Sequence, residues 1–387
     1  MKIGLVGYGK MGKGIFNLLS SLDHEVIVWM RDEKKVKEAQ NQIDRKLRRA
    51  LKNGIVTQDQ FQEKVSSLTF TDRMEDLAGC DLVIESVAED FQKKLTILQK
   101  LESILSPQAL LLTNTSSLSI NKLAGELKRS ERFCGFHFFY PVPLVNLIEI
   151  IKWENVSADV VNSLRVFAYA LGKEPIIIND APASGINDIL AYYYYEGAYI
   201  LEQGLAAPSL VDKAALGFSR VGPCESMDII GIKLIIETSE RTANMRKEGM
   251  LIPDLFYRLI SMDRLGRDCG KGFFIYRAEK MEDDVREFYL NPLQRHSYSS
   301  SSQDKSILPK RLLYSLFNGF LHSVSRGISS QAELNCGLKE VLGMTAGPWD
   351  MMKSIGKDTL AREFRFLAQH VGQRFEQGSG SALDNCL

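Results

Sequence analysis

The sequence predicts an α/β domain with a Rossmann-type, doubly wound sheet, followed by an all-α region in two copies. A glycine-rich turn joins an apolar strand to a helix near the start of the chain, and short apolar runs then alternate with helical segments. From residue 186 the pattern is almost wholly helical, and it repeats. We therefore expect a Rossmann domain at 1–181, a first helical copy at 182–280, a linker at 281–307 and a second copy at 308–387.

The composition is that of a globular protein without a bias in charge. Apolar residues make up 45% of the 387 residues, and 48 basic residues balance 48 acidic ones. This balance gives no support for a nucleic-acid partner or a membrane surface, and no apolar run reaches the length of a membrane span. The six cysteines lack the spacing of a zinc site or a disulfide framework. We expect no metal, and a cytoplasmic protein without a signal peptide.

The first strand and helix carry a dinucleotide-binding fingerprint. A short apolar strand is followed by Gly7-Tyr8-Gly9-Lys10-Met11-Gly12 and then by apolar residues at helical spacing. In such a turn Gly7 permits the bend, Gly9 lets the backbone approach a pyrophosphate, and Gly12 allows the helix to pack closely. Residues 25–30 read as a second strand, which completes a βαβ unit. The three glycines and Met11 are therefore predicted to bind a cofactor.

The end of the second strand leaves the choice of cofactor open. An acid there should hold the ribose of NAD, but this chain has Met30, Arg31 and Asp32. Arg31 could pair with the 2′-phosphate of NADP or stand as a solvated charge, and Asp32 could still reach the ribose. NAD and NADP both remain candidates. The basic helical segment at 33–53 is either a solvated face or a clamp for a phosphate-rich ligand tail, with Lys52 as a substrate contact.

Polar residues follow the next two predicted strands, 81–86 and 109–112. Glu89 comes after the first of them, and Asn114 lies in the cluster Thr113-Asn114-Thr115-Ser116-Ser117 after the second. Open α/β sheets bind their ligands at the carboxyl ends of the strands. We expect Glu89 and Asn114 to lie in the cofactor site.

Two further strands carry the predicted catalytic pair. His137 ends one strand within Gly135-Phe136-His137-Phe138-Phe139-Tyr140-Pro141, and Glu149 is a lone acid in the apolar run 144–151. Imidazole can take a hydroxyl proton reversibly near neutral pH, and a carboxylate on its other nitrogen fixes the tautomer and stabilises the imidazolium. Because an unpaired acid in an apolar strand would be costly, we predict that Glu149 orients His137.

The helical region contains an internal repeat. In each copy a long helix ends at a glycine, Gly204 or Gly327, and a Gly-Pro pair and an Ile-Gly pair follow at the same spacing. The stretch between the copies is polar and serine-rich at 297–302, as in a linker. The second copy has Lys310-Arg311-Leu312 where the first has Asn187-Asp188-Ile189, and we expect it to be non-catalytic.

Taken together, these motifs resemble the 3-hydroxyacyl-CoA dehydrogenase family over nearly the whole chain. The matching segments include the glycine turn, Val-Ile-Glu-Ser-Val-Ala-Glu, Thr-Asn-Thr-Ser-Ser, the His137 segment and Gly-Lys-Gly-Phe. The resemblance implies hydride transfer between a nicotinamide cofactor and a 3-hydroxyacyl thioester, with His137 and Glu149 as the catalytic pair. It also implies that Ser116 and Asn187 orient the substrate oxygen, and that Glu89 and Lys94 line the nicotinamide half of the site.

Three positions depart from the family pattern. Tyr140 stands where the family usually has Asn, so it becomes a candidate substrate contact. Asp188 replaces an arginine beside Asn187, and Arg31 departs from an NAD-type acid. These departures leave the acyl group and its carrier, CoA or acyl carrier protein, open.

Two alternative functions and two assembly states remain. The 6-phosphogluconate and 3-hydroxyisobutyrate dehydrogenase group shares Gly-x-Gly-x-Met-Gly, and the segment Asp180-Ala181-Pro182-Ala183-Ser184-Gly185 imitates one of its motifs, though at a different place in the chain. The other alternative is a catalytically silent cofactor-binding relative. The family's helical domain commonly dimerises, so the chain is expected to be a monomer with an internal pseudo-dimer or a homodimer.

Overall fold

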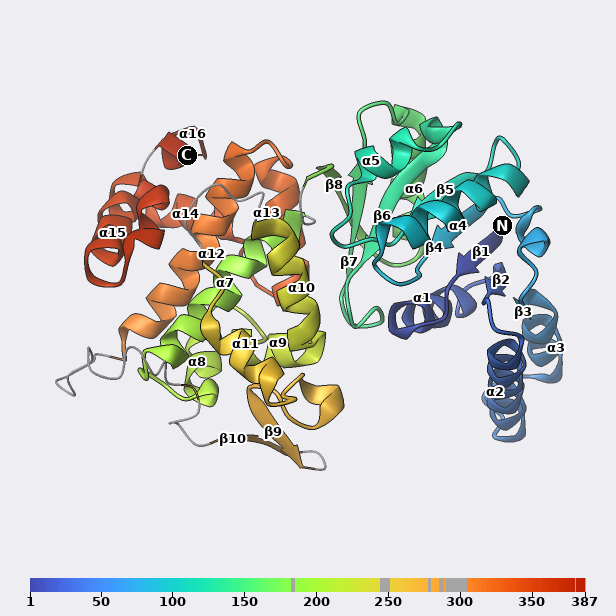
Figure 1. The fold of residues 1–387 in the computed structure, drawn as a ribbon, viewed down its shortest axis with the longest axis horizontal. Coiled ribbons are helices and arrows are strands. Elements are labelled where there is room, and N and C mark those ends of the chain that lie inside the picture. Colours follow the sequence, from blue (N-terminus) through green and yellow to red (C-terminus); the bar gives the residue numbers. More distant parts are fainter. Residues whose placement is uncertain are drawn as a thin grey trace. The chain divides into compact units, whose positions relative to one another are not determined.

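The computed structural model describes residues 1–181, 185–243, 251–277, 280–284, 289, 305–379 and 381–386. The chain separates into two compact units, Met1–Asp180 and Ala181–Leu387, which we call the first and second units (Figure 1). The predicted junction residues 182–184 and the serine-rich stretch 297–302 lie outside the described residues.

The first unit is built on an eight-stranded sheet in the order β3-β2-β1-β4-β5-β6-β7-β8. The neighbouring strands from β3 to β6 are parallel, β7 runs against β6, and β8 is parallel to β7. The predicted Rossmann-type sheet is therefore confirmed. The strands are β1 (Lys2–Val6), β2 (Glu25–Trp29), β3 (Leu68–Thr71), β4 (Leu82–Glu85), β5 (Leu110–Thr113), β6 (Phe133–Phe138), β7 (Leu147–Lys152) and β8 (Glu174–Asn179).

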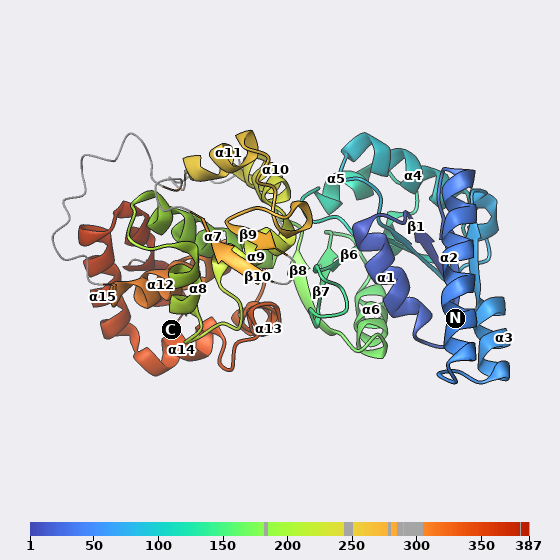
Figure 2. The ribbon, with the colours of Figure 1, turned by 90° about the horizontal axis from the view of Figure 1, so that it is seen from below.

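Helices cover both faces of this sheet, with α1 and α6 on one side and α4 and α5 on the other (Figure 2). Most of them begin at a polar side chain that accepts a hydrogen bond from the first turn, as at Asp32, Thr57, Asp90 and Ser157. The helices are α1 (Lys10–Ser20), α2 (Glu33–Lys52), α3 (Gln58–Ser67), α4 (Phe91–Ile104), α5 (Ile120–Gly125) and α6 (Ala158–Ala170), with short 3₁₀ turns at Met74–Leu77 and Ser130–Arg132.

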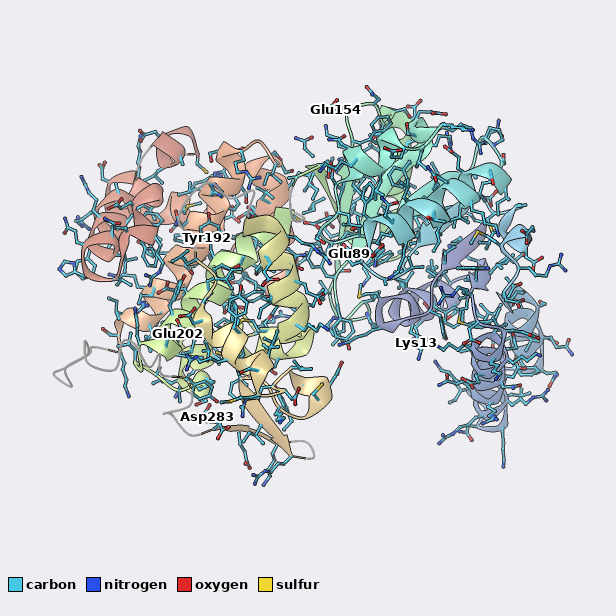
Figure 3. The ribbon with its side chains drawn as sticks, in the orientation of Figure 1. Lys13, Glu89, Glu154, Tyr192, Glu202 and Asp283 are labelled. Carbon is cyan, nitrogen blue, oxygen red and sulfur yellow. The ribbon has the colours of Figure 1, made fainter. Side chains whose placement is uncertain are left out.

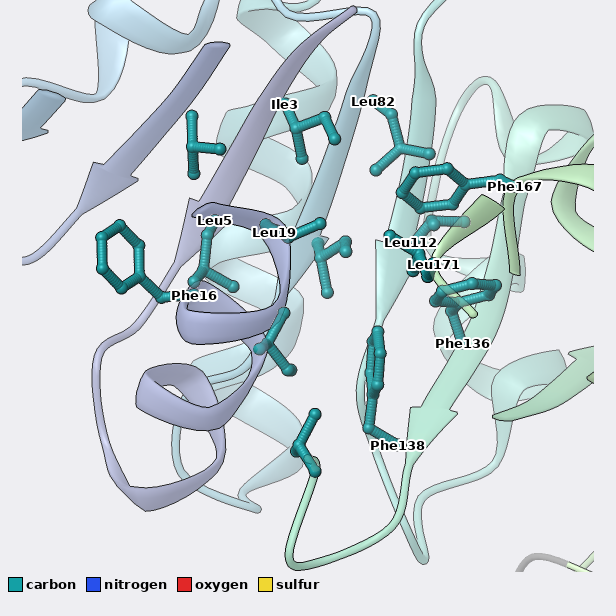
Figure 4. Close-up of a cluster of buried hydrophobic side chains, with 14 of the residues drawn as sticks. Ile3, Leu5, Phe16, Leu19, Leu82, Leu112, Phe136, Phe138, Phe167 and Leu171 are labelled. Atoms are coloured by element: carbon teal, nitrogen blue, oxygen red, sulfur yellow. The ribbon is translucent and has the colours of Figure 1, made fainter. Parts of the chain in front are cut away.

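The core of the first unit lies between the sheet and the helices α1 and α6 (Figure 4). Phe16 and Leu19 of α1 pack with the strand residues Leu5 and Phe136, and all four are at most 1% exposed. Burying each such side chain stabilises the fold by about 1.5–3 kcal/mol. This packing fixes the sheet and so determines where the carboxyl ends of β1, β4, β5 and β6 lie.

The second unit is mainly helical. Its helices are α7 (Gly185–Glu202), α8 (Pro208–Ala215), α9 (Pro223–Ile230), α10 (Ile232–Ala243), α11 (Asp254–Ser261), α12 (Ile307–Ser325), α13 (Gln331–Leu342), α14 (Pro348–Ile355), α15 (Lys357–His370) and α16 (Ser381–Cys386), with 3₁₀ turns at Arg267–Cys269 and Gln373–Ser379. The long helices α7 and α12 pack side by side (Figure 1). No helix in the described part of the chain is long and apolar enough to cross a membrane.

A small hairpin interrupts the helices of the second unit. Strand β9 (Phe274–Arg277) pairs antiparallel with β10 (Lys280–Asp283), so residues 281–283 of the expected linker belong to a strand. Asp283, labelled in Figure 3, accepts a hydrogen bond from the backbone N of Ser209 at the start of α8, 2.9 Å away. Because all four residues of β10 are exposed and only Met281 is apolar, no apolar alternation marks it in the sequence.

Candidate active site

The turn between β1 and α1 requires glycine at two positions and leaves space at a third. Gly7 has a φ of 101°, and a Cβ on it would lie 2.6 Å from the carbonyl oxygen of Ser86. A Cβ on Gly12 would lie 2.2 Å from the carbonyl oxygen of Gly7, whereas nothing stands within 4 Å of a Cβ on Gly9. Gly9 is the N-cap of α1. The start of this helix therefore has room for an anion beside its amide groups, which fits a dinucleotide pyrophosphate.

Of the residues that follow β2, Asp32 caps a helix, Arg31 is exposed and Met30 is buried. The carboxylate of Asp32 accepts hydrogen bonds from the backbone N of Lys34 at 3.0 Å and of Lys35 at 3.5 Å, so it caps α2. Arg31, beside it, is exposed, whereas Met30 is buried. The sequence offered Asp32 as a ribose contact without predicting this capping role.

Two more predicted contacts lie on the helices of this part of the unit. Met11 is half-buried and packs against the hydrophobic core from α1. Lys52 is the last residue of α2 and is exposed, as are Arg45, Lys46, Arg48 and Arg49 on the same helix. The basic cluster is thus a surface feature of α2.

His137 and Glu149 form a buried pair across two antiparallel strands. They stand directly opposite each other in the β6–β7 ladder, and Nδ1 of His137 lies 2.8 Å from Oε2 of Glu149. His137 is 5% exposed and Glu149 is fully buried. A proton on Nδ1 in this hydrogen bond leaves Nε2 as the nitrogen that can accept a proton from a ligand. The contact expected from the sequence is present.

Glu89 gathers donors from the loop after β5. Its Oε1 accepts hydrogen bonds from Oγ1 of Thr115 at 2.6 Å, from the backbone N of Ser116 at 3.0 Å and from the backbone N of Ser117 at 2.9 Å. Burial alone would raise the pKa of Glu89, but Lys94 and these donors outweigh it, so the pKa is lowered. Glu89, labelled in Figure 3, is therefore an anion that fixes the backbone of Ser116.

Behind this loop lies an ion pair that the sequence did not single out. Nζ of Lys94 is 2.9 Å and 3.1 Å from the two carboxylate oxygens of Glu85, and both side chains are fully buried. Glu85 also accepts a hydrogen bond from Oγ1 of Thr113 at 2.5 Å, and Lys94 lies 3.4 Å from Glu89. The sequence signals for Glu85 were its place near the end of an apolar strand and within the family-like segment Val-Ile-Glu-Ser-Val-Ala-Glu, and neither identifies Lys94 as its partner.

Asn114 links the ends of three neighbouring strands. Its Oδ1 accepts a hydrogen bond from the backbone N of Phe138 at 2.8 Å, and its Nδ2 donates to Oγ of Ser86 at 3.3 Å. The side chain predicted to contact the cofactor thus also holds the end of β6, next to His137.

The loop from β6 to β7 carries Tyr140 and is fastened from two sides. Nζ of Lys10, on α1, lies 4.0 Å from the centre of the Tyr140 ring. Nζ of the buried Lys173 donates to the carbonyl oxygens of Val142 at 2.6 Å and Val145 at 2.7 Å. These contacts connect the loop after His137 with the glycine turn and with the start of β8.

The remaining predicted site residue, Asn187, belongs to the second unit. It lies in the first turn of α7 and is half-buried, and its neighbour Asp188 is fully buried. Among the residues that the structure describes, no cluster of His, Cys, Asp or Glu could hold a metal ion.

Two family models match the chain. Residues 2–181 match the NAD binding domain of 3-hydroxyacyl-CoA dehydrogenase, and residues 186–276 match the C-terminal domain of the same family. The match of residues 2–181 supports NAD as the cofactor of the first unit.

Named relatives point to the same family. A 3-hydroxybutyryl-CoA dehydrogenase of Bradyrhizobium diazoefficiens is 31% identical over 282 residues, which cover 72% of this chain and 96% of that protein. A fatty acid oxidation complex subunit alpha of Vibrio campbellii is 30% identical and covers 98% of this chain, but the chain spans only 54% of that subunit's length. It likewise spans 59% of a 3-hydroxyadipyl-CoA dehydrogenase of Escherichia coli.

A solved structure shares the fold of the whole chain. The crystal structure of a 3-hydroxybutyryl-CoA dehydrogenase from Escherichia coli has a TM-score of 0.83 and 22% identity, and it covers 100% of this chain and 98% of that one.

Proposed function

Since this chain belongs to the 3-hydroxyacyl-CoA dehydrogenase family, we propose that it interconverts 3-hydroxyacyl and 3-ketoacyl thioesters by hydride transfer with NAD. The observation that carries the proposal is the buried pair of His137 and Glu149, with 2.8 Å between Nδ1 and Oε2. This pair is suited to accept a hydroxyl proton from a secondary alcohol.

His137 acts as the general base in the oxidation and as the general acid in the reduction. Its Nε2 takes the proton of the 3-hydroxyl group, and NAD held at the glycine turn would supply the hydride acceptor for the carbon that bears this group. Glu149 holds the imidazole in the required tautomer and stabilises the imidazolium that forms. Positioned general-base assistance of this kind contributes about 10²–10⁴ in rate.

Ser116 is the residue of the first unit that we assign to the substrate oxygen. The backbone of Ser116 is fixed by Glu89, 3.0 Å from its N, and the hydroxyl, 3.4 Å from the same carboxylate oxygen, would leave that contact to donate to the substrate oxygen. The same role is predicted for Asn187 of the second unit, in the first turn of α7. Tyr140 replaces the usual asparagine near the histidine, and we assign it to substrate selection.

The carrier of the acyl group is CoA in this proposal, because the named relatives act on CoA esters. An acyl carrier protein is the alternative. Either carrier presents phosphate groups, for which the exposed basic face of α2, including Lys52, is suited.

The test follows absorbance at 340 nm with acetoacetyl-CoA and NADH, for the unmodified chain and for His137→Gln. We expect turnover by the unmodified chain and a loss of at least about 100-fold in kcat for the variant, with NADH binding retained. Cofactor binding without turnover on any acyl thioester would instead identify a catalytically silent relative.

A further inference from the structure

The two central helices of the second unit, α7 and α12, correspond position by position. Asp188 and Arg311 occupy equivalent places 123 positions apart in the sequence, and so do Gln203 and Arg326. In an isologous interface, if residue i contacts residue j on the other side, then the equivalent of i contacts the equivalent of j.

The seam between α7 and α12 follows this rule. Oδ2 of Asp188 lies 3.5 Å from Nη1 of Arg326, and at the equivalent place Nη1 of Arg311 donates to Oε1 of Gln203 at 2.9 Å. Asp188 is fully buried and Arg311 is 2% exposed. The two helices therefore meet as the halves of a symmetric dimer do, within one chain.

The two helices also differ at a central pair of equivalent positions. Glu196 of α7 is buried between two guanidinium groups, with Oε1 2.6 Å from Nε of Arg311 and Oε2 2.7 Å from Nε of Arg374. Its equivalent on α12 is Gly319. A Cβ on Gly319 would lie 2.9 Å from the backbone oxygen of Ile189 and 2.9 Å from a ring carbon of Tyr192.

We propose that this seam accepts only the unlike pair, α7 with the α12 of its own chain, and rejects α7 paired with the α7 of a second chain. Such self-pairing would place Asp188 of one chain where Arg311 now faces Glu196, so two buried carboxylates would meet at each of two places. It would also put Glu196 in the place of Gly319, where even a Cβ has no room. Both charge and volume exclude this dimer.

The second helical copy, at 308–387, which we call the second helical set, thereby has a structural role that requires no catalytic residue. Lys310, at the position equivalent to Asn187, pairs with Glu363 of α15 at 2.8 Å. The set supplies the complementary face for α7, the helix on which Asn187 lies. This inference goes beyond the proposed reaction and holds whether or not that reaction is correct.

The experiment compares the full chain with Asp188→Arg, Arg326→Asp and the double exchange, by thermal unfolding and light scattering. Each single reversal puts like charges side by side in a mostly buried seam and is expected to lower Tm by roughly 5 °C or more. The double exchange restores the pair and should recover most of that loss. The unmodified chain is expected to have the mass of one chain, 43.6 kDa.

A second arm tests the lack of room at Gly319. Gly319→Ala should lower Tm, whereas Gly125→Ala, a helical position with nothing within 4 Å of the added Cβ, should leave it unchanged or slightly raised. Should Asp188→Arg fail to fold, the cycle of Asp188→Asn and Arg326→Gln gives the same comparison. Any of three results would overturn the proposal: additive losses in the cycle, equal effects of the two alanine substitutions on Tm, or a wild-type dimer that Asp188→Arg dissociates.

Discussion

Lys94 and Glu85 form an ion pair in which neither side chain reaches solvent, 2.9 Å apart behind the loop that holds Ser116. Lys94→Met would leave the carboxylate of Glu85 buried without its cation, which typically costs about 3–5 kcal/mol. We expect a loss of that order in the free energy of unfolding, measured by urea titration. Lys93→Met is the matched control, since the Lys93 side chain is 68% exposed, and it should change stability by less than about 0.5 kcal/mol.

Glu149→Gln should separate catalysis from binding. The amide lacks the charge that stabilises the imidazolium and can donate to Nδ1, which favours the wrong tautomer of His137. We expect kcat to fall by about 10²–10⁴ while KM for the thioester changes little. Steady-state kinetics against the exposed Glu154→Gln variant provides the comparison, and equal activity of the two variants would remove Glu149 from the mechanism.

Alanine substitutions at Gly12 and Gly9 in the glycine turn are expected to have different effects on stability and on cofactor binding. Gly12→Ala would force a Cβ to within 2.2 Å of the Gly7 carbonyl, so it should reduce both Tm and NADH binding. Gly9→Ala meets no atom within 4 Å, so it should keep Tm but weaken NADH binding, because the methyl group would occupy the space of the pyrophosphate. Thermal unfolding and a fluorescence titration with NADH distinguish the two effects; tight binding by Gly9→Ala would contradict the assignment of the turn.

Arg31→Ala tests the choice between the two nicotinamide cofactors. Arg31 is exposed directly after β2, where a guanidinium group could pair with a 2′-phosphate. If it does, the variant should bind NADPH at least about tenfold more weakly and NADH almost unchanged, as measured by parallel titrations. Unchanged NADPH affinity would leave Arg31 as a solvated charge.

Asp212 should make the second unit less stable as the pH rises. Burial raises the pKa of Asp212 to about 7, although hydrogen bonds from the backbone N of Cys224 and Glu225 lower it. The unfolded chain loses this proton near pH 4 and the folded chain keeps it to about pH 7, so stability falls across that window, by at most about 1.4 kcal/mol per pH unit.

Asp212→Asn should flatten this dependence. Asn335 already fills the equivalent place in the second helical set, where its Oδ1 accepts a hydrogen bond from the backbone N of Trp349 at 3.0 Å. Urea unfolding at pH 5 and pH 8 measures the effect, with the exposed Asp159→Asn as control. Parallel pH profiles for the unmodified chain and Asp212→Asn would contradict the prediction.

The sequence predicted the parts of the fold that have strong local patterns. The glycine turn, the strand that carries His137 and the long helix α7 were visible because apolar spacing and glycine positions are local properties. Helix α3 and strand β3 were not expected, since α3 is polar with no buried residue and β3 has only four residues. Polar segments that form through tertiary contacts give no periodic signal.

The site was predictable to the extent that its residues follow strand ends. His137 and Glu149 could be paired because they fall on consecutive predicted strands and a lone acid in an apolar strand needs a partner, whereas the opposite direction of the two strands was not predicted. The partner of Lys94 could not be predicted, because a buried ion pair depends on tertiary packing and leaves no local pattern in the sequence. From the sequence alone, the aspartate at Asp188, next to Asn187, had no explanation, because its partner Arg326 is more than 100 residues away in the sequence.

The pairing of α7 with α12 also has a consequence for the order of synthesis. At roughly 5–20 residues per second, α12 leaves the ribosome about 6–25 s after α7. During that interval the face of α7 that packs on α12, which carries Tyr192, lacks this partner, whereas Tyr193 and Tyr195 pack on Phe218 and Phe256, which are made earlier. Asp188 and Glu196 keep two negative charges on that face, which oppose its association with the same helix on a neighbouring nascent chain until its own α12 arrives.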